Sequence, residues 1–239
     1  MQNESKLLEK LVIWAITLCK FLLFASNTDP RIVINPIKDE ERPGSELAAG
    51  TAAAMAAASM LLREDDPVYA QELVKHARDL FEFADRFRDY YHRAIPDAEN
   101  FYKSSGFGDE LTWAALWIYY ASNDGWFLKK AEEKYSEFAL HINRPFSYFW
   151  DDVTIGVNIL LSNFATRDPA QYARKVEDFC DSQMKGGKEA VFTPKGLRYI
   201  HEWAPIRYSM NVAFICGIAA DQVCSQSCLV CSRLYLNRY

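Results

Sequence analysis

Residues 44–62 read GSELAAGTAAAMAAASMLL, and this stretch indicates the fold class more clearly than any other in the chain. It is rich in alanine, the residue with the highest helix propensity, and Ser45 can cap the start of a helix. Small side chains at most of its positions let neighbouring elements approach it closely on two sides. The stretch therefore predicts a helix over residues 45–62 that lies wedged between other helices.

The rest of the chain has the apolar spacing of helices, and the alternation typical of strands is nearly absent. Proline follows aspartate at positions 67 and 169, where it suits the first turn of a helix. The polar seams are short, and no linker rich in Gly, Ser or Pro divides the chain. The predicted helices cover about residues 4–25, 45–62, 66–92, 109–122 and 125–141, and three more begin at Asp151, at Asp168 and after Trp203.

Helices joined by tight turns favour stacked antiparallel hairpins. Such hairpins build either an open solenoid or a closed α/α toroid. A solenoid repeats its sequence every ~34–47 residues, and no repeat of this kind is present. We therefore predict an all-α fold in one domain, with the toroid favoured over the solenoid.

Composition excludes few functions. The 239 residues are 50% apolar and 25% charged, which is typical of a globular protein with a proper core. The net charge of −5 and the lack of a basic cluster argue against a nucleic-acid partner. The apolar run 11–25 is short for a membrane span and contains Lys20, so we expect a buried helix rather than a membrane segment or a signal peptide.

The cysteines form no framework that spans the chain, so they leave the redox compartment open. Cys224, Cys228 and Cys231 have the spacing of an iron–sulfur cluster loop, but no fourth ligand for zinc follows, and we expect no metal there. The six cysteines are Cys19, Cys180, Cys216, Cys224, Cys228 and Cys231.

Two acidic pairs, Asp109-Glu110 and Asp151-Asp152, each open a predicted helix. A carboxylate at such a position can cap the helix and complement its dipole, which is worth ~0.3–2 kcal/mol. Several converging carboxylates could instead bind Ca²⁺, which prefers hard oxygen ligands. A glycosidase needs two carboxyl groups ~5–9.5 Å apart, whereas adjacent helical side chains project about 100° apart. From the residues alone, capping is favoured over a calcium site, and a calcium site over a catalytic role.

Several segments together resemble the catalytic domain of glycoside hydrolase family 9, the endo-β-1,4-glucanases with an (α/α)6 toroid. They occur in the family's order over about residues 8–221, and any one of them alone is weak evidence. The segments are PGSELAA (43–49) with the alanine run after it, FYKSSGFGDELTWAA (101–115), WDD (150–152), FTPKGLRYI (192–200), WAPIRY (203–208) and NVAF (211–214).

The resemblance implies an incomplete (α/α)6 toroid over residues 1–221, followed by a tail outside the family pattern at 222–239. It also implies a role for each matching residue. Trp203 is similar to a sugar-stacking platform, with core packing as the alternative. Arg207 is similar to a guanidinium that hydrogen-bonds the glucan, with a surface ion pair as the alternative. Tyr102 and Asp152 are expected to face the glucan as well. The expected structural calcium site consists of Ser105, Gly106, Asp109, Glu110 and Asp151.

Two parts of the family pattern are absent from this sequence. One is the Asp-Ala-Gly-Asp segment whose carboxylate activates water, and the other is the glutamate that serves as general acid. Inverting hydrolysis requires both groups, so we assign no catalytic residue and expect this polypeptide by itself to be inactive. Gly50, where the family usually has Glu, and a shortened loop at 102–106 are smaller departures.

The resemblance therefore predicts part of an extracellular enzyme that hydrolyses internal β-1,4-glucosidic bonds in cellulose or related glucans by inversion. We expect β-1,4-glucan as its partner, neither nucleic acid nor membrane, and a monomer when complete. One alternative is a non-catalytic glucan-binding or interaction protein on a decayed hydrolase scaffold. Another, a helical-repeat adaptor, would need repeats that the sequence lacks.

Overall fold

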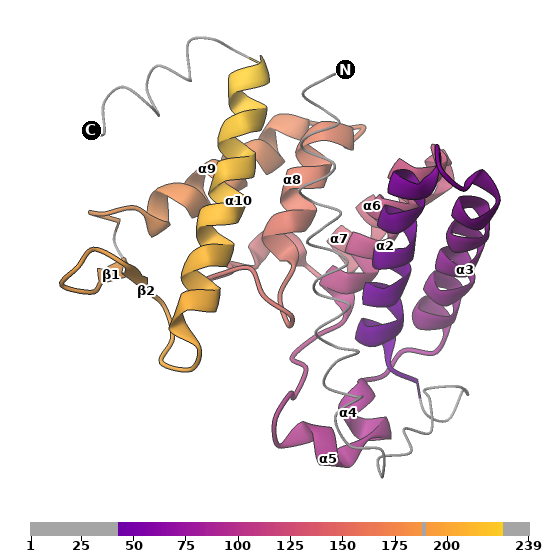
Figure 1. Cartoon of the computed structure of the whole chain (residues 1–239), viewed down its shortest axis with the longest axis horizontal. Coiled ribbons are helices and arrows are strands. Elements are labelled where there is room, and N and C mark those ends of the chain that lie inside the picture. Colours follow the sequence, from indigo (N-terminus) through magenta and orange to yellow (C-terminus); the bar gives the residue numbers. More distant parts are fainter. Residues whose placement is uncertain (1–42, 188–189, 227–239) are drawn as a thin grey trace. The chain divides into compact units, whose positions relative to one another are not determined.

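The computed structural model describes residues 43–187 and 190–226 (Figure 1). They belong to two compact units, which divide between Ile142 and Asn143. We call residues 43–142 the first unit and residues 143–226 the second unit. The helix predicted at residues 4–25 and the tail cysteines Cys228 and Cys231 lie outside the described residues.

The first unit consists of helical hairpins, and helix α2 is at its centre. Helix α2 packs against both α3 and α6, and α6 packs in turn against α7. Two short helices and a 3-10 turn complete the unit. The elements are α2 (Ser45–Leu62), α3 (Pro67–Arg86), α4 (Tyr91–Ala94), α5 (Pro96–Glu99), α6 (Gly108–Ser122), α7 (Gly125–Glu137) and η1 (Leu140–Ile142).

Helix α2 confirms the prediction of an alanine-rich helix wedged between neighbours. Ala49, Ala52 and Ala56 are fully buried, because α3 and α6 approach this helix on two sides. By length and composition α2 could also cross a membrane, but 56% of it is buried inside the protein, as in the core helix of a soluble protein. Burial among other helices explains its apolar character without a membrane.

The predicted cap at Ser45 is wrong. Gly44 is the residue before the helix, and no side chain caps it. The Ser45 hydroxyl instead donates to the Phe87 carbonyl at 3.2 Å and accepts from the Asp89 amide at 3.1 Å. Ser45 thus joins the start of α2 to the segment that follows α3.

Two predicted helices are too long. Helix α3 ends at Arg86 rather than near residue 92, and Pro96 then separates α4 from α5 because the residue before a proline disfavours helical dihedrals. Helix α7 ends at Glu137 rather than at residue 141, and Ala139 has a φ of +53°. The spacing of apolar residues in the sequence does not show where helices such as these end.

The second unit contains three helices and one short hairpin. Helix α9 packs on α8, and α10 contacts both. A buried apolar face of α8, including Ile155, Ile159 and Leu161, forms much of the core of the unit. The elements are α8 (Thr154–Phe164), α9 (Pro169–Gln183), β1 (Val191–Phe192), β2 (Arg198–Tyr199) and α10 (Pro205–Gln226).

The sequence did not predict the hairpin. Strand β1 pairs antiparallel with β2, with Val191 opposite Tyr199, and each strand has only two residues. Such strands are too short to show an alternating pattern. Gly196 in the turn has a φ of +85°, a conformation that favours glycine.

Cys180 of α9 and Cys216 of α10 form a disulfide across 36 residues of sequence. Spacing alone could not reveal this pair among six cysteines. The outward face of α10 exposes Ile206 and Met210, which are 61% and 64% exposed. The disulfide thus joins α9 covalently to α10, a helix whose exposed side includes these two apolar residues.

Candidate functional site

The loop that precedes α6 is held from several directions within the first unit. The Ser104 amide donates to Nδ1 of His92 at 3.3 Å, and the Ser104 hydroxyl donates to the Gly106 carbonyl at 2.6 Å. The Phe107 ring lies 5.4 Å from the ring of Tyr90. This loop therefore has a defined conformation where it enters α6.

Three buried carboxylates lie at the start of α6 and on α2. Asp109 and Glu110 are 7% and 5% exposed, and Glu46 of α2 is 7% exposed. Glu46 accepts a hydrogen bond from the Tyr91 amide at 2.8 Å. Glu46 has no role among the sequence-based predictions, although an acidic residue within an alanine-rich helix is a visible signal in the sequence.

Glu110 is in an unfavourable place for a carboxylate. Burial raises its pKa well above the ordinary value, and the charge and hydrogen bond of Asp109 and the charge of Glu46 act in the same direction. Its Oε2 atom is buried and has no hydrogen-bond partner among the described residues. Such an oxygen is stabilised either by a proton or by a cation.

The residues predicted to bind calcium are divided between the two units. Within the first unit, Gly106 and Asp109 are close, since a Cβ on Gly106 would lie 3.9 Å from Oδ1 of Asp109. Ser105 is exposed and lies in the same loop, and Asp151 belongs to the second unit. In the parts of the chain that the structure describes, no three His, Cys, Asp or Glu side chains gather as a metal site. The carboxylates, with hydroxyl and carbonyl oxygens nearby, are nevertheless the donor types that Ca²⁺ prefers.

The second acidic pair lies in a turn before α8. The backbones of Phe149 and Asp152 exchange two hydrogen bonds of 3.2 Å. Oδ1 of Asp152 accepts from the amide of Thr154, the first residue of α8, at 2.9 Å, but Val153 is the residue before the helix and no side chain caps it. Asp151 is half-buried in the same turn, and α8 begins at Thr154 rather than at residue 151.

Trp203 and Arg207 lie at the start of α10 in the second unit. Trp203 is 76% exposed, which excludes core packing within the described residues. The Arg207 guanidinium donates to the Tyr208 hydroxyl at 2.8 Å and lies over the Tyr208 ring, with Cζ 4.6 Å from the ring centre. Nε of Arg207 is buried without an acceptor among the described residues, and no described carboxylate pairs with this side chain. Among the described residues, the alternative of a surface ion pair for Arg207 therefore has no support.

The first unit contributes further aromatic side chains. Tyr102 is half-buried, and its carbonyl accepts from the Tyr91 hydroxyl. Its neighbour Phe101 is 80% exposed and had no predicted role. Phe101 stands out only because its large aromatic ring is exposed, and the sequence alone does not reveal that exposure.

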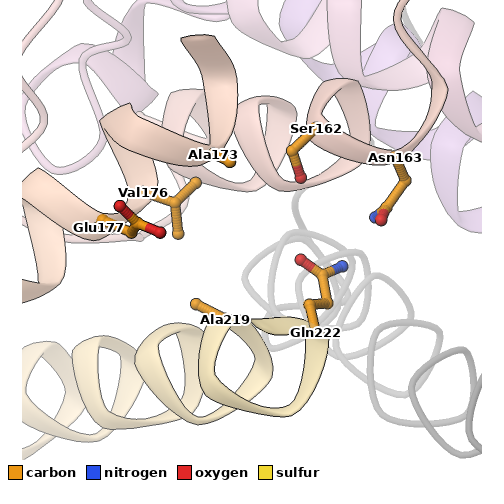
Figure 2. Close-up of a pocket in the computed structure, with 7 residues that line it drawn as sticks. All are labelled: Ser162, Asn163, Ala173, Val176, Glu177, Ala219 and Gln222. Carbon is orange, nitrogen blue, oxygen red and sulfur yellow. The ribbon is translucent and has the colours of Figure 1, made fainter. Parts of the chain in front are cut away.

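A small cavity lies between α8, α9 and α10 in the second unit (Figure 2). Its volume is about 40 Å³, which has room for a few water molecules but not for a sugar ring. This cavity is therefore not a glucan site. Its lining consists of Ser162, Asn163, Ala173, Val176, Glu177, Ala219 and Gln222.

Comparisons with known proteins agree on one family. The model of glycosyl hydrolase family 9 matches residues 23–235. Endoglucanase A of Bacillus pumilus is 36% identical over 193 residues, which cover 79% of this chain and 29% of that protein. Endoglucanase 5 of Arabidopsis thaliana is 37% identical over 193 residues, which cover 77% of this chain and 31% of that protein.

Solved structures give the same result. The endoglucanase of the termite Nasutitermes takasagoensis is 41% identical with a TM-score of 0.73, and the match covers 79% of this chain and 42% of that one. Endoglucanase CelQ of Clostridium thermocellum, solved with cellotriose, is 32% identical with a TM-score of 0.62 over 74% of this chain and 30% of that one.

The chain spans less than half the length of the relatives and structures described above. The structural neighbours are (α/α)6 barrels, which confirms the predicted fold class of a partial (α/α)6 fold built from helical hairpins. The family model covers most of the chain, and two independent kinds of comparison agree with it. On this evidence the chain belongs to glycosyl hydrolase family 9.

Proposed function

We propose that this chain forms a glucan-binding and ion-binding part of an endo-β-1,4-glucanase. The observation that carries the proposal is the pair of residues at the start of α10. Trp203 is largely exposed, and Arg207, four residues further on, is held against the Tyr208 ring. A flat ring and a fixed donor are the groups that a pyranose face and its hydroxyls require.

The chemistry of binding follows from these two side chains. The indole of Trp203 can cover the apolar face of a glucosyl unit and remove both surfaces from water. Arg207 can donate to a sugar oxygen without losing as much side-chain freedom as a mobile arginine, because Tyr208 already restrains it. Tyr102 and Asp152 are proposed as further contacts. Support comes from CelQ, a relative that has been solved with cellotriose and with cellotetraose.

A Ca²⁺ ion is proposed to bind at the loop before α6. Ser105, Gly106, Asp109 and Glu110, all of the first unit, would provide oxygen ligands, and the role expected for Asp151 stays a prediction. The bound ion would neutralise the carboxylates that burial leaves close together. The support is the unpartnered Oε2 of Glu110 and the burial of both acids.

We propose that this polypeptide by itself does not hydrolyse glucan. Asp152 accepts a hydrogen bond from the first residue of α8, and the side chains of Asp109 and Glu110 are hydrogen-bonded to each other rather than placed on opposite sides of a cleft. None of them is assigned as the proton donor or the water-activating base that inversion requires. The second candidate, a glucan-binding protein without catalysis, has the same support and differs only in what the whole protein does.

The proposed location is extracellular. Relatives of this family are generally secreted, and the Cys180–Cys216 disulfide is of a kind that persists in oxidising compartments. The proposed assembly state of the complete protein is a monomer, and the proposed end of the family domain is Asp221.

The test is titration of the purified chain with cellotetraose by isothermal calorimetry. We expect measurable binding, and we expect Trp203→Ala to weaken it by roughly tenfold, which corresponds to about 1.4 kcal/mol of lost binding free energy. Trp126→Ala is the matched control, because Trp126 is 47% exposed on α7 and has no proposed role in binding. Equal affinity of the Trp203→Ala variant and the wild type would refute the proposal. Release of reducing sugar in the same samples would contradict the proposed lack of hydrolysis.

A further inference from the structure

Four charged side chains at the ends of α3 and α7 form a closed ring of alternating charge. We call Asp85, Arg88, Lys134 and Glu137 the charge ring. Lys134 Nζ lies 2.6 Å from Asp85 and 3.0 Å from Glu137. Arg88 pairs with the same two carboxylates. Each acid therefore bridges both bases, and each base bridges both acids.

The charge ring is too well paired to be an ordinary set of surface charges. The Lys134 side chain is 7% exposed, and a buried ammonium group is tolerated only where carboxylates pair with it. The hydrogen bond from Arg88, and then that from Lys134, lowers the pKa of Glu137. Arg88 is held by two acids that come from different elements, α3 and α7, so its guanidinium has little freedom.

The guanidinium of Arg88, which the charge ring holds in place, also contacts an aromatic ring. Cζ of Arg88 lies 5.3 Å from the centre of the Phe138 ring, in cation–π geometry. The Phe138 ring lies 5.6 Å from the Phe107 ring, at an angle of 80°. Phe107 is the residue just before α6, next to the loop with the proposed ion ligands.

The same ring also closes on the first residue of α6. A Cβ atom on Gly108 would lie 2.3 Å from Cγ of Phe138, so the ring rests directly on the backbone. Phe138 therefore contacts the two residues that join the loop to the helix. A displacement of this ring toward α6 would therefore press on Phe107, Gly108 or both.

We propose that the charge ring positions the loop before α6 by holding Arg88 on Phe138, which in turn holds Phe107 and Gly108. Phe138 and Arg88 are then positioning residues for the ion ligands at 105–110, although neither touches the ion. The expected effect on Ca²⁺ affinity rests on the proposed calcium site. The contact from Arg88 to the loop does not depend on any ion.

The first experiment is a double-mutant cycle read by the Ca²⁺ affinity of the full chain, measured by calorimetry after chelator treatment. Arg88→Met keeps much of the side-chain length but removes the charge, and Phe138→Leu removes the aromatic ring. We expect each single change to weaken Ca²⁺ binding by roughly three- to tenfold. Because both act along one chain of contacts, the double variant should bind about as weakly as Phe138→Leu alone.

Lys130→Met is the matched control. Lys130 is on the same helix, pairs with Glu133 at 2.8 Å and lies over the Trp126 ring at 5.3 Å. Its charge also acts on Asp85 and Glu137, as that of Arg88 does, but the cation–π contact of Lys130 is to Trp126 rather than to Phe138. We expect its Ca²⁺ affinity to equal that of the wild type. An equal loss in Lys130→Met and Arg88→Met would mean that any lost ion pair weakens the site, and would overturn the inference.

The second experiment needs no ion. Hydrogen exchange of the amides at 104–110 is compared between wild type and Arg88→Met in the presence of chelator. Faster exchange in Arg88→Met, with unchanged exchange in the middle of α2, supports the inference. Unchanged exchange at 104–110 overturns it. If the wild type binds no Ca²⁺, the calcium proposal fails, while the exchange data still decide whether Arg88 positions the loop.

Discussion

Phe138 and Gly108 are so close that only glycine fits at the start of α6. The ideal Cβ position on Gly108 lies 2.3 Å from Cγ, 2.5 Å from Cβ and 2.7 Å from Cδ1 of Phe138. Real carbon atoms do not approach so closely, so one of the two residues must move if a methyl group is added. The relationship ties the end of α7 to the start of α6, where the proposed ion ligands begin.

Gly108→Ala should therefore destabilise the chain by about 1–3 kcal/mol, the range for overpacked cores. Gly125→Ala is the control at the start of α7, where an added methyl group would meet nothing within 4 Å. That variant should be neutral or slightly stabilising, because alanine loses less backbone entropy on folding. Urea unfolding of both variants measures the difference, and equal stability would contradict the contact.

Ala204→Gly should stabilise the second unit by about 1 kcal/mol. Ala204 has a φ of +49°, a left-handed conformation that costs an L-residue ~1–2 kcal/mol and costs glycine almost nothing. Ala213→Gly, at an exposed position within α10, should instead lose ~0.5–1 kcal/mol. Thermal melts of the two variants should thus shift in opposite directions.

Ca²⁺ should raise the melting temperature of the chain, and Glu110→Gln should reduce that rise. At 100 times the dissociation constant a bound ligand stabilises a protein by about 2.7 kcal/mol. In chelator the variant should melt above the wild type, because an amide avoids the cost of a buried charge beside Asp109. Glu99→Gln, at an exposed glutamate that pairs with Lys103, should respond to Ca²⁺ like the wild type. An unchanged response in Glu110→Gln would argue against this residue as a ligand.

Glu137 should make stability depend on pH in the acid range. Arg88 and Lys134 lower its pKa, so its contribution is present above the ordinary glutamate value of about 4.3 and is lost as the pH falls through the lowered value. The melting temperature of Glu137→Gln should be below that of the wild type at pH 7, and the gap should narrow below about pH 4.3. A gap that stays constant from pH 7 to pH 3 would show that the charge is not the cause.

Replacing Cys180 and Cys216 together by Ser should cost about 2–4 kcal/mol, since the disulfide closes a loop of 36 residues. A reducing agent should have the same effect on the wild type and no effect on the variant. Melting curves with and without the reducing agent provide the measurement. The glucan affinity should fall as well, because the disulfide holds α10 and Trp203 lies at the start of that helix.

The helices predicted best are those with strong local signals. The alanine run of α2 and the Asp-Pro starts of α3 and α9 gave the correct starts to within a residue. Helix ends were predicted less well. The breaks after Arg86 and Glu137 arise from tertiary contacts and backbone dihedrals, such as the positive φ of Ala139, that apolar spacing does not encode.

The candidate site was predictable only where one segment contains all its parts. Ser105, Gly106, Asp109 and Glu110 are within six residues of one another, and the structure places them at one junction of loop and helix. Glu46 and Phe138 reach the same junction from other helices, and no sequence spacing reveals such contacts. The position of the tail boundary after Asp221 stays a prediction, and α10 passes through it without a break.

The water-facing side of α10 has a consequence for the life of the protein in a cell. Ile206 and Met210 are exposed apolar side chains on α10, and a disulfide joins this helix to α9. Chaperones and proteases recognise exposed apolar side chains. The amount of this protein that accumulates in a cell should therefore depend on whether Ile206 and Met210 are covered soon after synthesis.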